Sequence, residues 1–380
     1  MKILILRLLI VSLFFQANCV DRKSIRINTI NNRENSNKFI LSNDRRKITI
    51  VSKQGDVRVW DLLSGNFIET TKLDINYLFH FAVSPDGTKI LTKSKSHTIQ
   101  LWDINNKYSS KTFGNFNFYW VKPNYKFSPD GTKILSSSLS QGTCLLDVDT
   151  GELINKFSLK KTEGIDFSWD GLKVLMWNYD TLQVWSLGQN KPLKCFQLYK
   201  SKVNSAIFSP DGAKILTGGD DTIVKLWEIR TGKLLKSFKG LNEKILSLGL
   251  SEDGSKVLAG SGFVKNETKV WDVKTENSLL TLKGHKGDIT FANYLNNKVI
   301  ITGDRFATAK LWDAQNGQLI CTLSFDFESK DAWVVTTPDG KYDANESGLR
   351  YLFYINHSKK ITLPQNDPNF ITTCSPPSIL

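Results

Sequence analysis

Short runs that alternate apolar and polar residues recur along the chain, and residues 208–238 show the pattern most clearly. Residues 213–217 form an apolar run with β-branched members, residues 222–227 alternate with a period of two, and residues 234–238 form a third run. A period of two predicts a β-strand, because successive side chains of a strand point to opposite faces. The sequence Pro-Asp-Gly at 210–212 predicts a tight turn, because proline presets φ, aspartate binds the backbone and glycine accepts positive φ.

The same pattern returns at intervals of 39 to 44 residues. Its most regular position carries tryptophan in six copies and leucine in one, at Trp60, Trp102, Leu146, Trp185, Trp227, Trp271 and Trp312. A Ser-x-Asp-Gly turn recurs between these positions, with its aspartate at Asp86, Asp130, Asp170, Asp211 and Asp253. A small sheet with two apolar faces can hide both of them only between two neighbours. Seven in-phase copies therefore predict a closed, all-β repeat architecture.

These residues resemble the WD40 repeat family, and the resemblance covers residues 38–325. It implies a β-propeller of four-stranded blades around a central channel, with seven blades. It also implies that the repeat tryptophans are structural. We expect replacement of Trp227 by alanine to cost roughly 3–5 kcal/mol, as for other large-to-small changes in a core.

The family's structural tetrad of histidine, serine or threonine, aspartate and tryptophan is eroded. In the seventh copy His285, Thr302 and Trp312 match the pattern, but Phe306 stands at the aspartate position. The fifth copy has Tyr199 at the histidine position. We therefore predict that no copy holds a complete tetrad and that apolar packing between blades supplies most of the stability.

Two interpretations fit residues 326–357. In one, they form a degenerate eighth blade, and a strand from Ser24–Ile30 closes the ring. In the other, which we favour, they extend a seven-bladed ring and begin a short helix near Asn345. The stretch 333–344 is similar to segments that follow WD40 repeats in some bacterial proteins. Residues 358–380 contain four prolines and predict an extended or disordered tail.

The N-terminus predicts export. Lys2 and Arg7 precede Leu8–Phe15, an apolar run too short to cross a bilayer but typical of a secretory signal. Residues 1–19 are then either a signal peptide or a lipoprotein leader whose lipidated residue is Cys19, which would anchor the protein to a membrane. Residues 20–37 follow as an N-terminal segment with one strand. The predicted location is a bacterial cell envelope or the extracellular medium.

Composition excludes several classes of function. The net charge of +13 is spread over all copies instead of being clustered, so we do not expect nucleic acid as a partner. The five cysteines are scattered and include no CxxC pair, which is no metal pattern. The four histidines have no HExxH spacing, and neither a GxSxG elbow nor a phosphate-binding loop is present. We predict no cofactor and no catalytic centre.

A lysine recurs directly after each predicted turn. The seven positions are Lys47, Lys89, Lys133, Lys173, Lys214, Lys256 and Lys298. In a propeller they would form a cationic ring on one face, which could meet an acidic partner or anionic lipid headgroups. The alternative is that lysine only solvates the turn.

Aromatic residues gather in copies three and four. Phe116, Phe118, Tyr119, Trp120, Trp177 and Tyr179 fall in or beside loops that a propeller would place on its opposite face. Aromatic residues are enriched at binding hot spots, so these are candidate protein-binding residues. The alternative is that strand alternation buries some of them inside the blades.

The sequence therefore predicts a non-enzymatic, exported and monomeric scaffold that binds other proteins through its loop surfaces. The alternative is a propeller that uses its central channel to bind a small molecule or to catalyse a reaction, which would need polar groups that converge near the axis.

Overall fold

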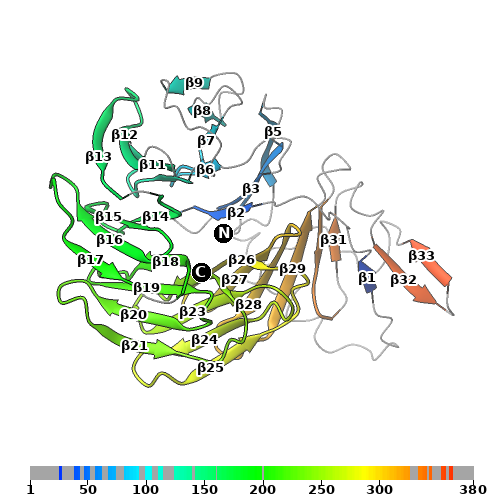
Figure 1. Ribbon diagram of the computed structural model, residues 1–380. Helices are drawn as coiled ribbons and strands as arrows, with labels where there is room; N and C mark the ends of the chain where they lie inside the picture. The colour runs from blue at the N-terminus through cyan, green and yellow to red at the C-terminus, as the bar shows by residue number, and fades with distance from the viewer. Residues whose placement is uncertain are drawn as a thin grey trace, which may run out of the picture.

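The computed structural model describes residues 25–27, 38–42, 47–51, 56–61, 67–73, 81–93, 99–104, 110–113, 124–138, 142–159, 161–198, 201–325, 333–339, 342–344, 352–356 and 359–362. These residues form strands and turns, and none of them lies in a helix. Figure 1 shows that the strands are gathered into sheets that stand in a circle. The predicted all-β propeller of seven blades is confirmed.

Each blade is an antiparallel sheet whose strands follow chain order. Blades 1 to 4 consist of β2 (Lys38–Leu41), β3 (Lys47–Val51), β4 (Asp56–Asp61) and β5 (Phe67–Lys72); β6 (Phe81–Val83), β7 (Lys89–Lys93), β8 (Ile99–Asp103) and β9 (Ser110–Phe113); β10 (Asn124–Phe127), β11 (Lys133–Ser138), β12 (Gly142–Asp147) and β13 (Leu153–Phe157); and β14 (Gly164–Phe167), β15 (Lys173–Trp177), β16 (Thr181–Ser186) and β17 (Lys194–Gln197).

Blades 5 to 7 continue the series. They consist of β18 (Val203–Phe208), β19 (Lys214–Gly219), β20 (Val224–Glu228) and β21 (Leu234–Phe238); β22 (Ile245–Leu250), β23 (Lys256–Ser261), β24 (Thr268–Asp272) and β25 (Ser278–Leu282); and β26 (Ile289–Asn296), β27 (Val299–Asp304), β28 (Thr308–Asp313) and β29 (Leu319–Phe325). Two further strands, β30 (Trp333–Thr336) and β31 (Tyr342–Ala344), extend this sheet from β29, so the seventh sheet has six strands.

Apolar packing between neighbouring blades closes the ring. Seven buried clusters lie one at each junction between blades. The closing cluster joins Ile48 and Ile50 of blade 1 to Ile301 and Leu323 of blade 7. Among the described strands, neither of these two blades takes a strand from the other end of the chain. Side-chain burial therefore holds the first and last blades together.

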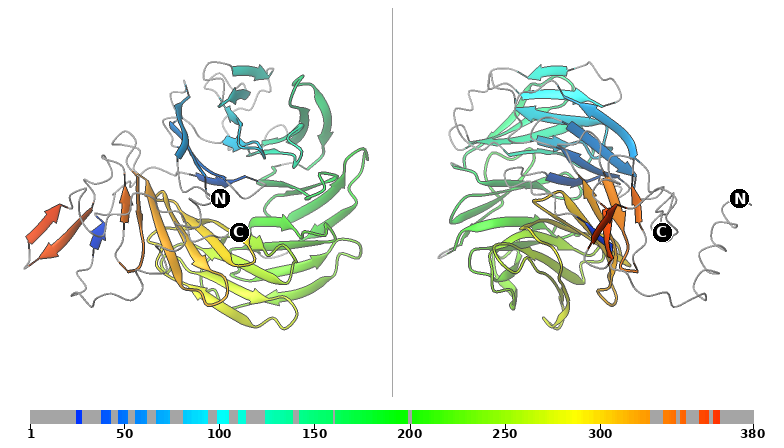
Figure 2. Two further views of the ribbon diagram at one scale, coloured as in Figure 1. Left: turned by 180° about the vertical axis from the view of Figure 1, so that it is seen from behind. Right: turned by 90° about the vertical axis from the view of Figure 1, so that its right-hand side faces the viewer.

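The C-terminal strands form a sheet beside the ring. Strand β1 (Ile25–Ile27) pairs with β32 (Leu352–Asn356), which pairs with β33 (Lys359–Thr362). Figures 1 and 2 show this small sheet outside the circle, beyond β31. A strand from 24–30 thus does meet the C-terminal segment, but it does not complete an eighth blade. The expected helix near Asn345 falls outside the described residues, as does most of the 358–380 tail.

The Ser-x-Asp-Gly turns owe their shape to side-chain hydrogen bonds. In blade 5 the Ser209 hydroxyl donates to Asp211 at 2.5 Å, and the amide of Ala213 donates to the same carboxylate at 3.0 Å. The Ser209 oxygen also accepts the amide of Lys214 at 2.9 Å, and Gly212 has φ of +62°. The same Ser–Asp bond recurs at Ser84, Ser128, Ser168 and Ser251. The motif therefore fixes the connection between the first two strands of each blade that carries it.

Candidate functional site

The innermost strands of all seven blades line a central channel. The channel has a volume of about 380 Å³, and each blade contributes lining residues, among them Ser42, Val83, Phe127, Asp166, Phe208, Leu250 and Asn293. Its charged groups include Lys126 of β10, whose ammonium forms an ion pair with Asp166 of β14. The side chain of Asp166 is 9% exposed and that of Lys126 is 48% exposed, so this pair ties blade 3 to blade 4 at the channel wall.

The Ser-x-Asp-Gly turns surround one mouth of this channel. Turns of neighbouring blades lie against each other. A Cβ atom at Gly131 would lie 3.6 Å from Cδ of Pro85 in the preceding blade, and one at Gly171 would lie 3.5 Å from Cδ of Pro129. The face that they form is called the turn face below. In blades 2 to 6 the connection between the first two strands is short and held by its Ser–Asp pair, so side chains at the variable turn positions project from a rigid frame.

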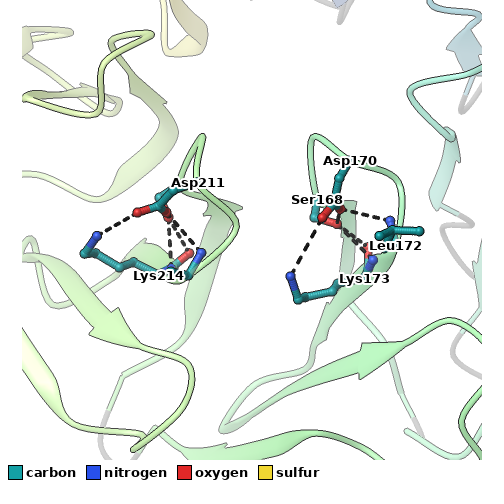
Figure 3. Close-up of polar contacts among 8 residues, drawn as sticks. Ser168, Asp170, Leu172, Lys173, Asp211 and Lys214 are labelled. Carbon is teal, nitrogen blue, oxygen red and sulfur yellow. Dashed lines mark hydrogen bonds and ion pairs between the residues drawn. The ribbon is translucent and has the colours of Figure 1, made fainter.

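The seven recurrent lysines all lie on the turn face. Six begin the second strand of their blade, and Lys298 directly precedes β27. Several are paired with acidic groups of the turns: Lys214 contacts Asp211 at 2.9 Å, and Lys133 contacts Asp130 at 3.7 Å. Figure 3 shows the turns of blades 4 and 5 side by side, with Lys173 and Lys214 next to their own aspartates. The ring thus alternates positive and negative charges, which lowers the net charge that an acidic partner would meet.

The turn aspartates stay ionised down to low pH. Hydrogen bonds from the Ser251 hydroxyl and from the amide and hydroxyl of Ser255 lower the pKa of Asp253 to about 2. Burial alone would raise the pKa of Asp211, but hydrogen bonds from Ser209 and neighbouring donors outweigh it and lower this pKa to about 2 as well. These carboxylates are therefore charged at any pH near neutrality.

Two of the five turns lack the usual proline: blade 6 has Glu252 there, and blade 4 has a large apolar residue. Trp169 replaces the usual proline and Leu172 follows the glycine. Asp170 keeps the common geometry, since its carboxylate accepts the Ser168 hydroxyl and the amide of Leu172 at 2.9 Å (Figure 3). Trp169 lines the channel mouth and is 50% exposed, and Leu172 is 62% exposed. We did not single out these two residues from the sequence, although the departure from Ser-Pro-Asp-Gly was the available signal.

The structure describes two of the six residues of the predicted aromatic cluster, Trp177 and Tyr179. Phe116, Phe118, Tyr119 and Trp120 lie outside the described residues. Trp177 does not belong to a surface: it is the last residue of β15, it is buried, and it packs in the cluster between blades 4 and 5. The alternation of β15 turns its indole inward, against Gly164. Tyr179, two residues later in the loop, is 60% exposed.

The repeat tryptophans occupy equivalent positions in their third strands. Trp185, Trp271 and Trp312 are buried, whereas Trp102 and Trp227 are partly exposed. Trp60 has the same register in β4, opposite Ile48. The indole N–H of Trp102 donates to Thr92 at 2.8 Å, and that of Trp227 donates to Thr217 at 2.9 Å. Each bond joins the second and third strands of its blade.

One structural tetrad is complete, contrary to our prediction. In blade 7 the indole N–H of Trp312 donates to Thr302 at 2.8 Å, and Thr302 lies 2.7 Å from Nε2 of His285. Asp304 accepts from Nδ1 of the same ring at 3.1 Å. Its carboxylate comes from the end of β27, two residues before Phe306, where the pattern places the aspartate. Burial lowers the pKa of His285 against the opposing effect of Asp304, so a neutral ring with its proton on Nδ1 satisfies all three contacts.

Other acidic and thiol side chains that could suggest a metal site have structural surroundings. Asp220 accepts from Asn204 at 2.8 Å and pairs with Lys244, and Asp221 pairs with Lys225, so this acidic doublet belongs to a turn. Within the described residues, Cys144, Cys195 and Cys321 form no disulfide. In the part of the chain that the structure describes, no three histidine, cysteine or acidic side chains are grouped as a metal site requires. No helix within the same residues is both long and apolar enough to cross a membrane.

Known proteins resemble parts of this chain. The family model "WD domain, G-beta repeat" matches residues 190–228. Protein tipD of Dictyostelium discoideum is 31% identical over 80 residues, which are 21% of this chain and 13% of tipD. The probable coatomer subunit beta' of Schizosaccharomyces pombe is 22% identical over 193 residues, which are 50% of this chain and 18% of that protein. The chain thus aligns with less than a fifth of either relative.

The chain thus folds as a seven-bladed β-propeller, and one of its repeats matches the WD40 family model.

Proposed function

We propose that this propeller is a non-enzymatic scaffold that binds another protein on its turn face. The observation that carries the proposal is the pair Trp169 and Leu172, two large apolar side chains exposed beside the channel mouth. Tryptophan is among the residue types most enriched at hot spots of protein interfaces. WD40 propellers are generally scaffolds of this kind, which supports the same function.

The surroundings of these two residues favour a protein partner. Paired lysines and aspartates on the neighbouring turns supply a polar rim around an apolar centre, which is the common anatomy of a protein interface. The turns are rigid, so little conformational entropy is lost when a partner binds. The partner would cover the channel mouth and place an apolar group against Trp169.

Paired substitutions test this surface. The double variant Trp169→Ser with Leu172→Ser is expected to weaken binding of the partner by more than about tenfold, because it removes the apolar centre of the contact. The full-length chain serves as bait in a pull-down from cells of its source, and the recovered proteins are quantified against wild type. Leu153→Ser, a residue of the outer strand β13 that is 51% exposed, is the matched control. Recovery of the same proteins by the double variant and by wild type would contradict the proposal.

We also propose that the protein is exported and that its leader ends at or before Cys19. The support is the sequence of residues 1–19 alone, with its basic start and apolar run. Mass spectrometry of the protein purified from its own cells is expected to find an N-terminus within residues 18–22, with a diacylglycerol on Cys19 if the leader is of the lipoprotein type. A mass that includes residues 1–15 would contradict export.

A further inference from the structure

The loop between β23 and β24 in blade 6 exposes two adjacent apolar residues. Phe263 is 81% exposed and Val264 is 74% exposed, the two highest values among the exposed large apolar side chains of the described residues. The loop connects the second and third strands, so it lies on the face opposite the turn face. These two side chains are not part of the core of this chain, so core packing does not explain why they are apolar.

A hydrogen-bond network holds this loop in one conformation. The carboxylate of Glu243, from the segment between blades 5 and 6, accepts the amides of Val264 at 3.0 Å and Lys265 at 2.7 Å. It also accepts the amide of Asn266 at 3.3 Å, while the buried side chain of Asn266 accepts the amide of Phe263 at 3.4 Å. Three amides on one carboxylate fix the direction of the tip.

The backbone of the loop takes conformations that are unusual for residues with side chains. Phe263 has φ of +133° and Asn266 has φ of +50°, conformations that L-residues other than glycine adopt rarely. Gly262 lies so close to the start of blade 7 that a Cβ atom would be 2.9 Å from Cβ of Asp288. Strain of this kind persists only where surrounding contacts impose it, and it concentrates at functional segments.

We propose that Phe263 and Val264 form a preorganised docking knob that inserts into an apolar pocket of a protein partner. The knob is convex, so the partner must supply the concavity. Lys265 is exposed directly beside it, which fits an acidic residue on the rim of that pocket. This surface is separate from the Trp169 site, so the inference extends the proposed scaffold to a second face.

The charges near the knob favour a protein over a lipid surface. The Glu243 carboxylate lies at the base of the loop, and Glu267 lies just behind it, paired with Lys283 at 3.1 Å. Lys283 offsets Glu267 and Lys265 offsets Glu243, so these four groups carry no net positive charge that would attract an anionic bilayer. Two adjacent side chains also fit a pocket that accepts one or two side chains better than they fit a planar surface.

Photo-crosslinking followed by affinity measurement tests the knob. The full-length chain carries p-benzoylphenylalanine at position 263, or at position 153 as a control, and is irradiated in an extract of its source cells. A protein crosslinked from 263 and not from 153 is then purified, and its affinity is measured for wild type, Phe263→Ser, Glu243→Ala and Leu153→Ser. The same irradiation is carried out with vesicles of phosphatidylglycerol and phosphatidylcholine, to test whether position 263 crosslinks to lipid.

The proposal expects a discrete protein adduct from position 263 and a loss of affinity of about tenfold or more in Phe263→Ser. Glu243→Ala should also weaken binding and should speed amide exchange of residues 264–266, because it releases the loop while keeping its apolar side chains. Leu153→Ser should bind as wild type. Absence of a specific adduct, unchanged affinity in Phe263→Ser, or adducts with lipid would overturn the knob. The scaffold function would still stand if the Trp169 and Leu172 variant alone lost its partner.

Discussion

Replacement of Trp271 by alanine is expected to lower the free energy of unfolding by about 3–5 kcal/mol, the usual cost of truncating a large buried side chain. Trp271 is 1% exposed, and its ring packs 6.2 Å from that of Phe238 in the preceding blade. Its indole N–H donates to the carbonyl of Lys239 at 3.0 Å. The side chain therefore stabilises both its own blade and the junction with blade 5, and alanine would leave a cavity at that junction.

Urea unfolding followed by far-ultraviolet circular dichroism measures this loss. Trp227→Ala should cost less than the roughly 3–5 kcal/mol expected from the sequence, because Trp227 is only partly buried. Trp169→Ala, at an exposed position, should change stability by no more than about 0.5 kcal/mol. Equal losses for Trp271→Ala and Trp169→Ala would show that the ring does not depend on the packing between blades 5 and 6.

Replacement of Asp304 by alanine is expected to destabilise the protein by about 3 kcal/mol or more, because it removes the acceptor of three donors and each buried donor left unsatisfied costs about 1–3 kcal/mol. Asp304 is 1% exposed and accepts from His285, from the amide of Phe306 at 3.0 Å and from the amide of Thr308 at 3.1 Å. Alanine would leave these donors buried without an acceptor, which costs more than the hydrogen bonds contribute.

The matched control is Asp221→Ala in blade 5, whose carboxylate is partly exposed and pairs with Lys225. That change should cost less than about 1 kcal/mol, because water can replace an exposed ion pair. Thermal unfolding of both variants gives the comparison. If Asp304→Ala were as stable as Asp221→Ala, the tetrad of blade 7 would have no structural importance.

The sequence predicted the ring because its period is a property of the whole chain. Seven tryptophan-type positions and their turns fix the strand order, and closure follows from the two apolar faces of each sheet. Single residues that depart from the repeat pattern were harder to assign from the sequence. Asp304 was missed because it reaches the histidine from two residues before the expected position, a shift that backbone geometry in β27 allows and a fixed spacing does not reveal.

The candidate surfaces, too, could be predicted from the sequence only in part. The lysine ring could be placed from the sequence, since all its members share one register, but the ion pairs that reduce its net charge depend on side-chain geometry. Trp177 was predicted to lie in or beside a loop, and it is the last residue of β15, but the pattern alone did not show that its side chain is buried. The exposure of Phe263 depends on the contacts of its loop with Glu243, which lies far back in the chain, and no local pattern encodes them.

Closure of the ring is the claim on which both proposed surfaces depend, and a distance measurement tests it most directly. Nitroxide labels at positions 47 and 298 lie in the first and last blades, and labels at 173 and 214 lie in two adjacent blades at the same register. Pulsed electron paramagnetic resonance should find the 47–298 separation close to the 173–214 separation, because closure makes blades 1 and 7 neighbours. A 47–298 distance several times the other would show an open array and contradict the propeller.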